Sequence, residues 1–380
     1  MISLPLVYNP LRNALEEVSE LSIEIDAIIV GRYKVMAMIG KGTFSRVFQC
    51  LDLKLDRLVS IKVIRNDKDC FDAGLGELRV LSLLSKQDPH ARLPRLCLYD
   101  YFYYREHLYI VTELLEDSLF DFYKHIGAAE PMGLRSYFTM SSIAKIAQQI
   151  LATLQVLHSL GLTHSDIKPE NVCFSSLASC EVKLIDFGSC MLEYDTTSSY
   201  VQSRWYRAPE VMLGIRWDAK IDMWSLGCLL CELTIGHPLF LGDSIAEVLS
   251  AQQAVLGPHP EHLLNSAHPG IFASLFTSAT NATLYSVDPS GKPAGCYALR
   301  PRSTSLRDVL GKHDDDFYDL MEGLLAYDPS DRLSAEEAIN HTFIRKHAEG
   351  PHAACASGTA SPDSIMTPVT TPKPVDEHGG

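Results

Sequence analysis

The stretch from His164 to Asn171 places three side chains suited to phosphoryl transfer close together. Asp166 can orient a hydroxyl and accept its proton, Lys168 can meet the transferring phosphate, and Asn171 can bind Mg²⁺ through its amide oxygen. A second hard oxygen ligand, Asp186, ends an apolar run in the sequence Leu-Ile-Asp-Phe-Gly. Because phosphoryl transfer depends mainly on positioning and charge neutralisation, this set of residues predicts that chemistry.

A glycine-rich turn between two strand-like runs is the candidate for holding the phosphates. Glycines let backbone N–H groups approach phosphate oxygens without a Cβ in the way. Taken alone, the turn favours an ordinary β-hairpin; a dinucleotide-binding turn is excluded because a strand, not a helix, follows it. We predict nucleotide contacts along Ile39, Gly40, Lys41, Gly42, Thr43, Phe44, Ser45, Arg46 and Val47.

Lys62 and Glu77 form a candidate ion pair for the same nucleotide. Lys62 ends the apolar run that begins at Val59, and Glu77 lies in the next helical segment. A helix carboxylate that pairs with this ammonium would hold it against the α- and β-phosphates of the nucleotide. We assign Lys62, its strand neighbour Ser60 and Glu77 to the nucleotide site. The alternative is an unrelated surface lysine and surface glutamate.

Strands and one helix must position the turn and the lysine. Alternating apolar residues between 31 and 115 predict five strands and a helix over Phe71–Ser85, which makes a small α+β lobe. The strands are expected at Tyr33–Ile39, Arg46–Leu51, Leu58–Ile64, Cys97–Tyr104 and His107–Leu114. From 116 to 346 the chain is predicted to be mainly helical, with helices over Ile143–Leu160, Ile221–Thr234, Asp315–Ala326 and Ala335–His341.

Three other segments surround these lobes. Residues 1–30 form a lead-in whose acidic stretch Glu16–Asp26 has weak helical periodicity. An insert of about 242–310 includes a Ser/Thr/Gly/Pro-rich part, with a hairpin expected around Leu284–Leu299. Residues 347–380 are rich in Ser, Thr and Pro and are predicted to be disordered. They contain three candidate sites for proline-directed phosphorylation, Ser361-Pro362, Thr367-Pro368 and Thr371-Pro372.

Charge and composition exclude several classes of function. The net charge is −14 and the sequence pI about 5.4, so we expect no nucleic-acid partner. The longest apolar run, near Cys228–Leu241, is too short and interrupted to span a membrane, and the first residues do not form a signal peptide. We therefore expect a cytoplasmic or nuclear protein, neither secreted nor membrane-bound. Ten cysteines without a framework spacing favour free thiols.

Together these motifs resemble the protein kinase fold, over roughly Gly31–Lys346. The resemblance implies a two-lobed α+β architecture, with a small N-terminal lobe (N-lobe) of five antiparallel strands plus one helix. It also implies a larger, mainly helical C-terminal lobe (C-lobe) and the cofactors ATP and Mg²⁺. Glu113 and Leu115 look like hinge residues that bind adenine, and Thr112 like the gatekeeper. Glu210 and Arg332 are expected to form a buried structural ion pair in the C-lobe.

Finer features are similar to the dual-specificity tyrosine-regulated kinases, the DYRK family of the CMGC group. They include the segment Ser199–Glu210, the run Ile221–Cys228 and the large insert after Leu241. Asn66–Asp69 and Tyr101–Leu108 look most like the DYRK-related kinases of plants and protists. The runner-up is the CLK or LAMMER kinases, because Leu256-Gly257-Pro258 resembles the end of their signature, although the residues before it do not match.

Ser165 departs from the arginine that most protein kinases have at this position and that grips a phosphorylated activation loop. DYRK relatives commonly carry a small residue there and autophosphorylate a loop tyrosine, which is Tyr200 in this chain. Arg204 and Arg207 are close enough in sequence to bind its phosphate bidentately. Our hypothesis is that phospho-Tyr200 locks the loop.

Gly74 and Gly76 are a second departure, just before Glu77. A glycine inside a helix costs about 1 kcal/mol relative to alanine. We therefore predict loose first turns and a partly formed Lys62–Glu77 pair in the absence of ligand. The alternative is a helix that begins at Glu77.

The expected function is an active Ser/Thr protein kinase that also phosphorylates its own tyrosine. We expect a monomer that acts on protein substrates, with a proline after the target residue because Arg207 resembles the CMGC arginine that helps admit it. A nucleotide-binding pseudokinase scaffold is the main alternative, but Lys62, Asp166, Asn171 and Asp186 are all present. A small-molecule transferase is disfavoured by the Ala-Pro-Glu segment, which in the protein kinase family shapes a peptide groove.

Overall fold

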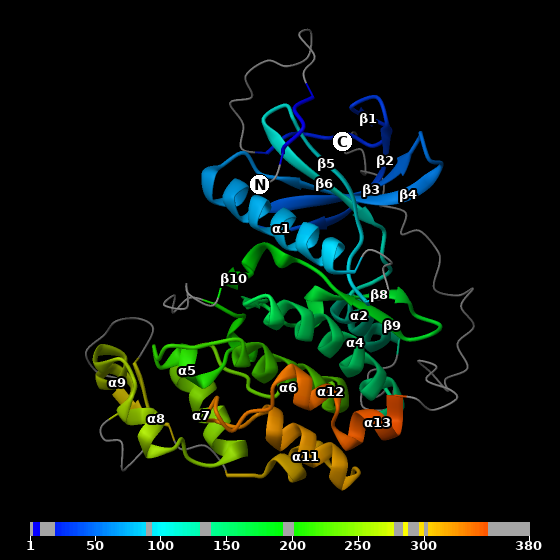
Figure 1. Cartoon of the computed structure of the whole chain (residues 1–380). Helices are drawn as coiled ribbons and strands as arrows, with labels where there is room; N and C mark the ends of the chain where they lie inside the picture. The colour runs from blue at the N-terminus through cyan, green and yellow to red at the C-terminus, as the bar shows by residue number, and fades with distance from the viewer. Residues whose placement is uncertain are drawn as a thin grey trace, which may run out of the picture.

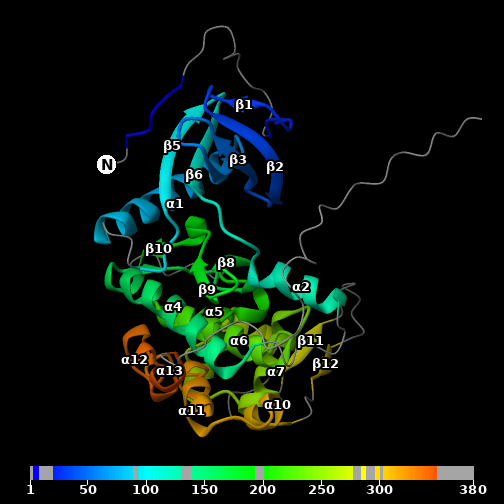
Figure 2. The same ribbon diagram turned by 90° about the vertical axis from the view of Figure 1, so that its right-hand side faces the viewer.

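The computed structural model describes residues 3–7, 20–88, 93–129, 138–192, 201–276, 284–287, 296–299 and 303–348. A small sheet-containing lobe sits above a larger helical lobe, as Figures 1 and 2 show from two directions. The predicted two-lobed α+β fold is confirmed.

The N-lobe is built on one antiparallel sheet with strand order β1-β2-β3-β4-β6-β5. Its strands are β1 (Ile28–Ile29), β2 (Tyr33–Lys41), β3 (Ser45–Asp52), β4 (Arg57–Ile64), β5 (Leu98–Tyr104) and β6 (His107–Glu113). The prediction of five strands was one short, because two residues of the lead-in pair with β2. So short a strand has no periodicity that a sequence pattern could reveal.

Helix α1 (Lys68–Gln87) lies against this sheet (Figure 1). Asp67 is its N-cap and accepts a hydrogen bond from the backbone N–H of Cys70. Its buried face includes Leu78, Leu81 and Leu84, which join the main hydrophobic core. The helix therefore begins well before Glu77 and carries that residue at a buried position.

The C-lobe is organised around two helices, α4 (Met140–Ser159) and α6 (Lys220–Ile235). Every residue of α6 from Ile221 to Ile235 is buried, so this helix is the centre of the lobe. The other helices are α2 (Leu119–Ala129), α5 (Pro209–Met212), α7 (Ile245–Leu256), α8 (Glu261–Asn265), α9 (Pro269–Leu275), α10 (Leu306–Leu310), α11 (Asp315–Leu324), α12 (Ala335–Ile339) and α13 (Thr342–Ala348). The short strands are β7 (Leu162–Thr163), β8 (Val172–Ser176), β9 (Glu181–Leu184) and β10 (Met191–Leu192).

The structure confirms the hairpin predicted in the insert but shows no helix in the described part of the lead-in. The expected hairpin exists as β11 (Tyr285–Val287) paired with β12 (Cys296–Ala298). The described part of the lead-in from Glu20 to Asp26 contains no helix, because its chain is extended and buries Leu21 in the N-lobe core. The remainder of that expected helix and the predicted disordered tail after Ala348 lie outside the described residues.

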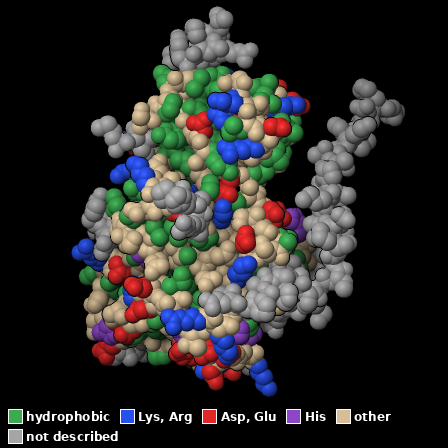
Figure 3. All heavy atoms as spheres, turned by 45° about the vertical axis from the view of Figure 1, so that its right-hand side comes forward, with side chains coloured by type: hydrophobic (Ala, Val, Ile, Leu, Met, Phe, Trp, Pro, Cys, Tyr) green, Lys and Arg blue, Asp and Glu red, His purple; other side chains and the backbone are tan. Residues whose placement is uncertain are grey.

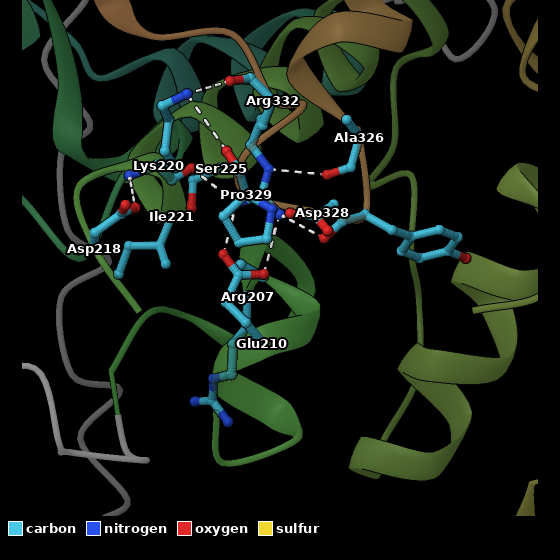
Figure 4. A network of polar contacts seen from close by, with 12 residues as sticks. Arg207, Glu210, Asp218, Lys220, Ile221, Ser225, Ala326, Asp328, Pro329 and Arg332 are labelled. Atoms are coloured by element: carbon cyan, nitrogen blue, oxygen red, sulfur yellow. Dashed lines mark hydrogen bonds and ion pairs between the residues drawn. The ribbon is translucent and has the colours of Figure 1, made fainter. Parts of the chain in front are cut away.

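Glu210 and Arg332 form the predicted ion pair, and both side chains are fully buried (Figure 4). The guanidinium makes two parallel bonds to the carboxylate, at 2.6 and 3.0 Å. It also donates to the backbone carbonyls of Ala326, Lys220 and Tyr327. The pair joins α5, which carries Glu210, to the segment before α12, which carries Arg332. It therefore fixes the position of the chain that leads from Val201 into α5.

Most described cysteines are free thiols, as expected, but Cys180 is disulfide-bonded. Cys228 and Cys231 lie buried on one face of α6. No helix of the described chain has the length and apolar character that a membrane span requires. In Figure 3, hydrophobic side chains spread over the N-lobe, whereas acidic, basic and histidine side chains gather at the base of the C-lobe.

Candidate active site

The loop around Asp166 is held from below by one buried carboxylate, Asp222 of α6. Its two oxygens accept the backbone N–H groups of His164 and Ser165 at 2.8 and 2.9 Å, and His158 Nε2 lies 2.9 Å from one of them. Ser165 has a φ of +65°, a conformation that is strained for a residue with a Cβ. The carboxylate of Asp222 therefore fixes a bend in the backbone that the serine alone would not favour.

Asp166 lies at the centre of three polar side chains, those of Lys168, Asn171 and Ser203. Lys168 Nζ donates to its Oδ2 at 2.8 Å, and Asn171 Nδ2 donates to the same oxygen at 3.0 Å. Ser203 Oγ donates to Oδ1 at 2.8 Å and accepts from Lys168 Nζ at 3.0 Å. These bonds hold the carboxylate in one orientation and keep the lysine ammonium beside it.

Lys62 connects two carboxylates across the space between the lobes. Its Nζ lies 2.8 Å from Glu77 Oε2 and 2.9 Å from Asp186 Oδ1. Burial opposes the charge of Lys62, but the two carboxylates outweigh it and raise the pKa of the ammonium above its ordinary value. Burial raises the pKa of Glu77, whereas for Asp186 the attraction of Lys62 outweighs burial and lowers the pKa. The expected Lys62–Glu77 pair is thus present.

Asp186 is aimed by the residues beside it. It has a φ of +60°, and the next residue, Phe187, is fully buried with its ring edge-on to the ring of His164 at 5.4 Å. His164 Nε2 lies 3.1 Å from the backbone oxygen of Ile185. Burying Phe187 beneath the site turns Asp186 toward Lys62 and links it to the loop that carries Asp166.

The glycine-rich turn joins β2 to β3, with Gly40 opposite Val47 and Lys41 opposite Arg46. A Cβ built at Gly40 would make only ordinary contact with Val47, and one built at Gly42 would lie 3.8 Å from the Ser45 backbone oxygen. Neither glycine has a positive φ. The protein itself therefore does not require glycine at these positions, which leaves close approach of a ligand as the reason for it. Ile39 and Phe44 are exposed beside them.

The hinge glutamate is fastened to both lobes. Lys183 of β9 donates to both oxygens of Glu113, at 2.8 and 2.7 Å, and the backbone N–H of Cys97 donates to Oε1 at 2.7 Å. Within the described chain, the N–H of Leu115 has no backbone acceptor. Ser60 pairs with Thr112 in the sheet, and the preceding residue, Val59, pairs with Glu113, so Ser60, Thr112 and Glu113 lie close together.

The segment after Tyr200 is shaped by Arg207 and Gln202. Arg207 is buried and donates to the backbone carbonyls of Val201 and Gln202, at 2.8 and 2.7 Å. Gln202 has a φ of +65°, its N–H donates to Ser165 O at 3.0 Å, and its side chain bonds Ser225 and Ala208. This backbone contact joins the segment to the catalytic loop at the position where an arginine is missing.

Arg204 and Tyr200 are the other two residues predicted to act in the activation loop. Arg204 is exposed and donates to Asp243 O at 2.6 Å. Tyr200 lies outside the described residues, so its hypothesised contact with the two arginines stays a prediction.

An open groove of about 1120 Å³ runs past these residues. One part is lined by Thr43, Phe44, Asp166, Ser203 and Arg207, and another by Val211, Met212, Ile245 and Ile271. Ile271 is brought there by a close contact: a Cβ on Gly214, whose φ is +66°, would lie 2.7 Å from its Cδ1. The insert helix α9 thus contributes to the wall of a groove that begins at the catalytic loop.

The prediction of loose first turns in α1 was wrong, and so was the alternative that the helix starts at Glu77. The helix is continuous from Lys68, and the Lys62–Glu77 pair is formed. The reason for one glycine is packing: a Cβ on Gly74 would lie 3.0 Å from both Ile64 and Leu108. Gly74 therefore allows α1 to approach the sheet closely.

Asn171 and Asp186 are suited to a magnesium site that is completed by a nucleotide. Asn171 uses its Nδ2 group to bond the Asp166 backbone and side chain, which leaves its amide oxygen as the ligand atom. The described residues contain no group of three or more His, Cys, Asp or Glu that could hold a metal. Mg²⁺ commonly takes one or two protein ligands and receives the rest from phosphates and water, so this donor set fits it.

Three residues of the site were missed from the sequence. Asp222 had a detectable signal, because a carboxylate in an otherwise apolar helix needs a buried partner. Ser203 and Lys183 had none, since their partners lie 37 and 70 positions away in the chain.

Comparison with known proteins gives a consistent picture. The protein kinase domain model matches residues 33–344. The chain is 34% identical to dual specificity tyrosine-phosphorylation-regulated kinase 2 of Drosophila melanogaster over 344 residues, 90% of this chain and 45% of that one. It is 35% identical to human dual specificity tyrosine-phosphorylation-regulated kinase 4, over 84% of this chain and 58% of that one. This chain therefore spans about half the length of these two relatives.

A third relative matches over most of its length. The serine/threonine-protein kinase AFC3 of Arabidopsis thaliana is 36% identical over 340 residues, which are 83% of this chain and 82% of that one. All the catalytic and nucleotide-binding motifs described above lie inside residues 33–344, which the protein kinase domain model matches.

Proposed function

The chain belongs to the protein kinase family, and within its CMGC group to the DYRK kinases, and we propose that it transfers the γ-phosphate of Mg-ATP to Ser and Thr of protein substrates. The observation that supports this most directly is the arrangement around Asp166. One carboxylate is held by Lys168, Asn171 and Ser203 beside an open groove. An inactive nucleotide-binding scaffold would not need this arrangement.

Each residue of the site has a role in the proposed reaction. Lys62, held by Glu77, binds the phosphates, and the glycine-rich turn covers them. Asp166 orients the substrate hydroxyl and accepts its proton, while Lys168 neutralises charge on the transferring group. Asn171 and Asp186 would hold Mg²⁺, which neutralises charge on the phosphates when bound. The backbone of Glu113 and Leu115 would bind adenine.

The experiment that tests this compares Asp166→Asn with the wild type. We expect ADP release with a basic protein substrate and Mg-ATP to fall by about 10²-fold to 10⁴-fold, because the variant cannot accept the proton. Binding of a fluorescent ATP analogue serves as the control and should remain. Equal turnover by the two proteins would refute catalysis at Asp166, and nucleotide binding without turnover in either would favour the scaffold.

We further propose that the site prefers proline directly after the target residue. Arg207 bonds the carbonyls of Val201 and Gln202, so these oxygens are already occupied by a charged donor that a substrate N–H would have to compete with. An ordinary residue seated there would leave its N–H without a partner, whereas proline has no N–H. A positional peptide library tests this: a flat preference at the position after the target residue would contradict it.

Autophosphorylation of Tyr200 is proposed on the same basis. Relatives named for dual specificity support it, and Arg207 already lies against the two residues that follow this tyrosine. Mass spectrometry of active recombinant protein should find phosphate on Tyr200. Full activity with an unmodified Tyr200 would eliminate the proposed lock.

A further inference from the structure

The open groove beside Asp166 can bind an extended peptide, and its lining indicates which kind of peptide fits. Arg207, whose surroundings we propose to favour proline, lies in its wall, and so do the apolar side chains Val211, Met212, Ile245 and Ile271. A fitting occupant is an extended segment with Ser-Pro or Thr-Pro followed by residues of low charge. The stretch Ser364–Val375 reads Ser-Ile-Met-Thr-Pro-Val-Thr-Thr-Pro-Lys-Pro-Val and contains one charged residue, Lys373.

The described structure shows where this segment is attached. Helix α13 ends at Ala348 and packs against α4, and Ser141 Oγ at the start of α4 donates to the His347 backbone oxygen at 2.8 Å. Helix α4 has 20 residues, which correspond to a length of about 30 Å. The catalytic loop follows its other end, after the short strand β7. The attachment point and Asp166 are therefore separated by roughly one helix length.

The chain after Ala348 is long enough to cover this distance. The roughly 19 residues between Ala348 and Thr367 span up to about 65 Å when extended. This contour length exceeds the roughly 30 Å between the attachment point and Asp166, and a short tether gives an effective concentration near the millimolar range. The shorter tether to Ser361 leaves less length for a path around the lobe.

We propose that this chain phosphorylates Thr367 and Thr371 of its own C-terminal segment, within one molecule. The proposal rests on the proposed kinase function and on its preference for proline. The threonine Oγ attacks the γ-phosphorus of ATP, an O–P bond forms, and the bond from that phosphorus to the β–γ bridging oxygen breaks. ADP leaves with the electron pair, and the hydroxyl proton passes to Asp166. Pro368 and Pro372 occupy the position beside Arg207 in turn.

The test uses the full chain with Mg-ATP, followed by mapping of phosphorylated residues by mass spectrometry. We expect phosphate on Thr367 and Thr371 in the wild type and on neither in Asp166→Asn. A Ser-Pro peptide in the same tube reports the kinase function separately. Phosphorylation of that peptide without phosphate on either threonine would overturn this inference alone, whereas no phosphate on the peptide or on the chain would overturn the proposed function.

Two matched variants test recognition of proline. Pro368→Ala should reduce phosphate on Thr367 at least tenfold and leave Thr371 as it is, and Pro372→Ala should have the reverse effect. Unchanged phosphate at the threonine beside each altered proline would overturn the role assigned to Arg207. Pro368 and Pro372 are not residues of the active site, so neither substitution should change phosphorylation of the Ser-Pro peptide.

Dilution tests whether the reaction stays within one molecule. The fraction of Thr367 phosphorylated per minute should not change when the protein is diluted tenfold at constant Mg-ATP. A rate that falls in proportion to concentration would overturn the intramolecular route. Wild-type protein mixed with Asp166→Asn should, on our proposal, leave the variant's Thr367 unmodified at low concentration.

Discussion

Two ionic clusters of this molecule use similar groups for opposite purposes. Arg332 and Glu210 are fully buried, form one cation and one anion, and have five bonds from the guanidinium to the carboxylate and to backbone carbonyls. Lys62 is partly exposed and lies between two carboxylates, of which Asp186 is 44% exposed. The first cluster is neutral and closed. The cluster of Lys62, Glu77 and Asp186 has one more negative than positive charge, and it is open to solvent at Asp186.

The difference indicates which cluster can take part in chemistry. A closed, neutral pair has no capacity left for a ligand, so it can only hold segments together. A lysine shared between two carboxylates can exchange one contact for a phosphate, while the freed carboxylate can receive a cation. Removing Arg332 should therefore mainly reduce folding stability, whereas removing Lys62 should mainly reduce activity.

The largest effect is expected for Arg332→Met. This change leaves Glu210 buried without a partner, which costs about 3–5 kcal/mol of folding free energy. Urea unfolding should show this loss. Arg332→Lys is the matched control and should recover part of it, because lysine keeps the charge but not the two parallel bonds. A loss below about 1 kcal/mol for Arg332→Met would refute the structural role of the pair.

Lys62→Met should affect activity far more than stability. We expect kcat/KM for ATP to fall at least 100-fold, which corresponds to about 3 kcal/mol of transition-state free energy. The midpoint of urea unfolding should change little, since Asp186 is exposed to water and Glu77, whose pKa is already raised, can take up a proton. A variant that loses stability as severely as Arg332→Met would remove the distinction between the clusters.

Glu232 of α6 shows the effect of burial on a carboxylate that has no ionic partner. It accepts a hydrogen bond from the Tyr206 hydroxyl at 2.6 Å, and no cation lies beside it among the described residues. Burial raises the pKa of Glu232 to about 7. The folded state then holds a proton that the unfolded chain loses near pH 4.5, so this group lowers the unfolding free energy as pH rises from about 4.5 to 7.

Glu232→Gln tests this pH dependence. The wild type should lose about 2–3 kcal/mol more than the variant between pH 5 and pH 8. Burial lowers the pKa of His259 to about 3, which gives the opposite slope in acid, but His259 is present in both proteins and cancels in the comparison. Parallel pH profiles of the two proteins would contradict the raised pKa.

The smallest effect concerns the two glycines of α1, which lie on different sides of the helix. Gly76→Ala should stabilise the protein by about 1 kcal/mol, because nothing lies within 4 Å of the added Cβ. Gly74→Ala should lose this gain, because its Cβ would press on Ile64 and Leu108. Urea unfolding of both variants gives the comparison, and equal stabilisation would contradict the close packing at Gly74.

Much of the site could be predicted because its residues are marked by local spacing. Asp166, Lys168 and Asn171 lie within one loop, and Asp186 follows one strand, so their order along the chain reflects their arrangement in space. The glycine-rich turn is marked by its residue types. The insert was harder: α7, α8 and α9 were not foreseen, since α8 and α9 have only five and seven residues and the 12-residue α7 has a weak apolar periodicity.

The sequence by itself determined the chemistry available to this chain: the carboxylates, the lysines and the glycine-rich turn, in an order typical of protein kinases. The tertiary structure decided which of these groups meet and how each is held. Ser203 reaches Asp166, Lys183 reaches Glu113, and Gly74 lets α1 approach the sheet. None of these contacts has a local signature, because each joins segments far apart in the chain and depends on the packing of the whole core.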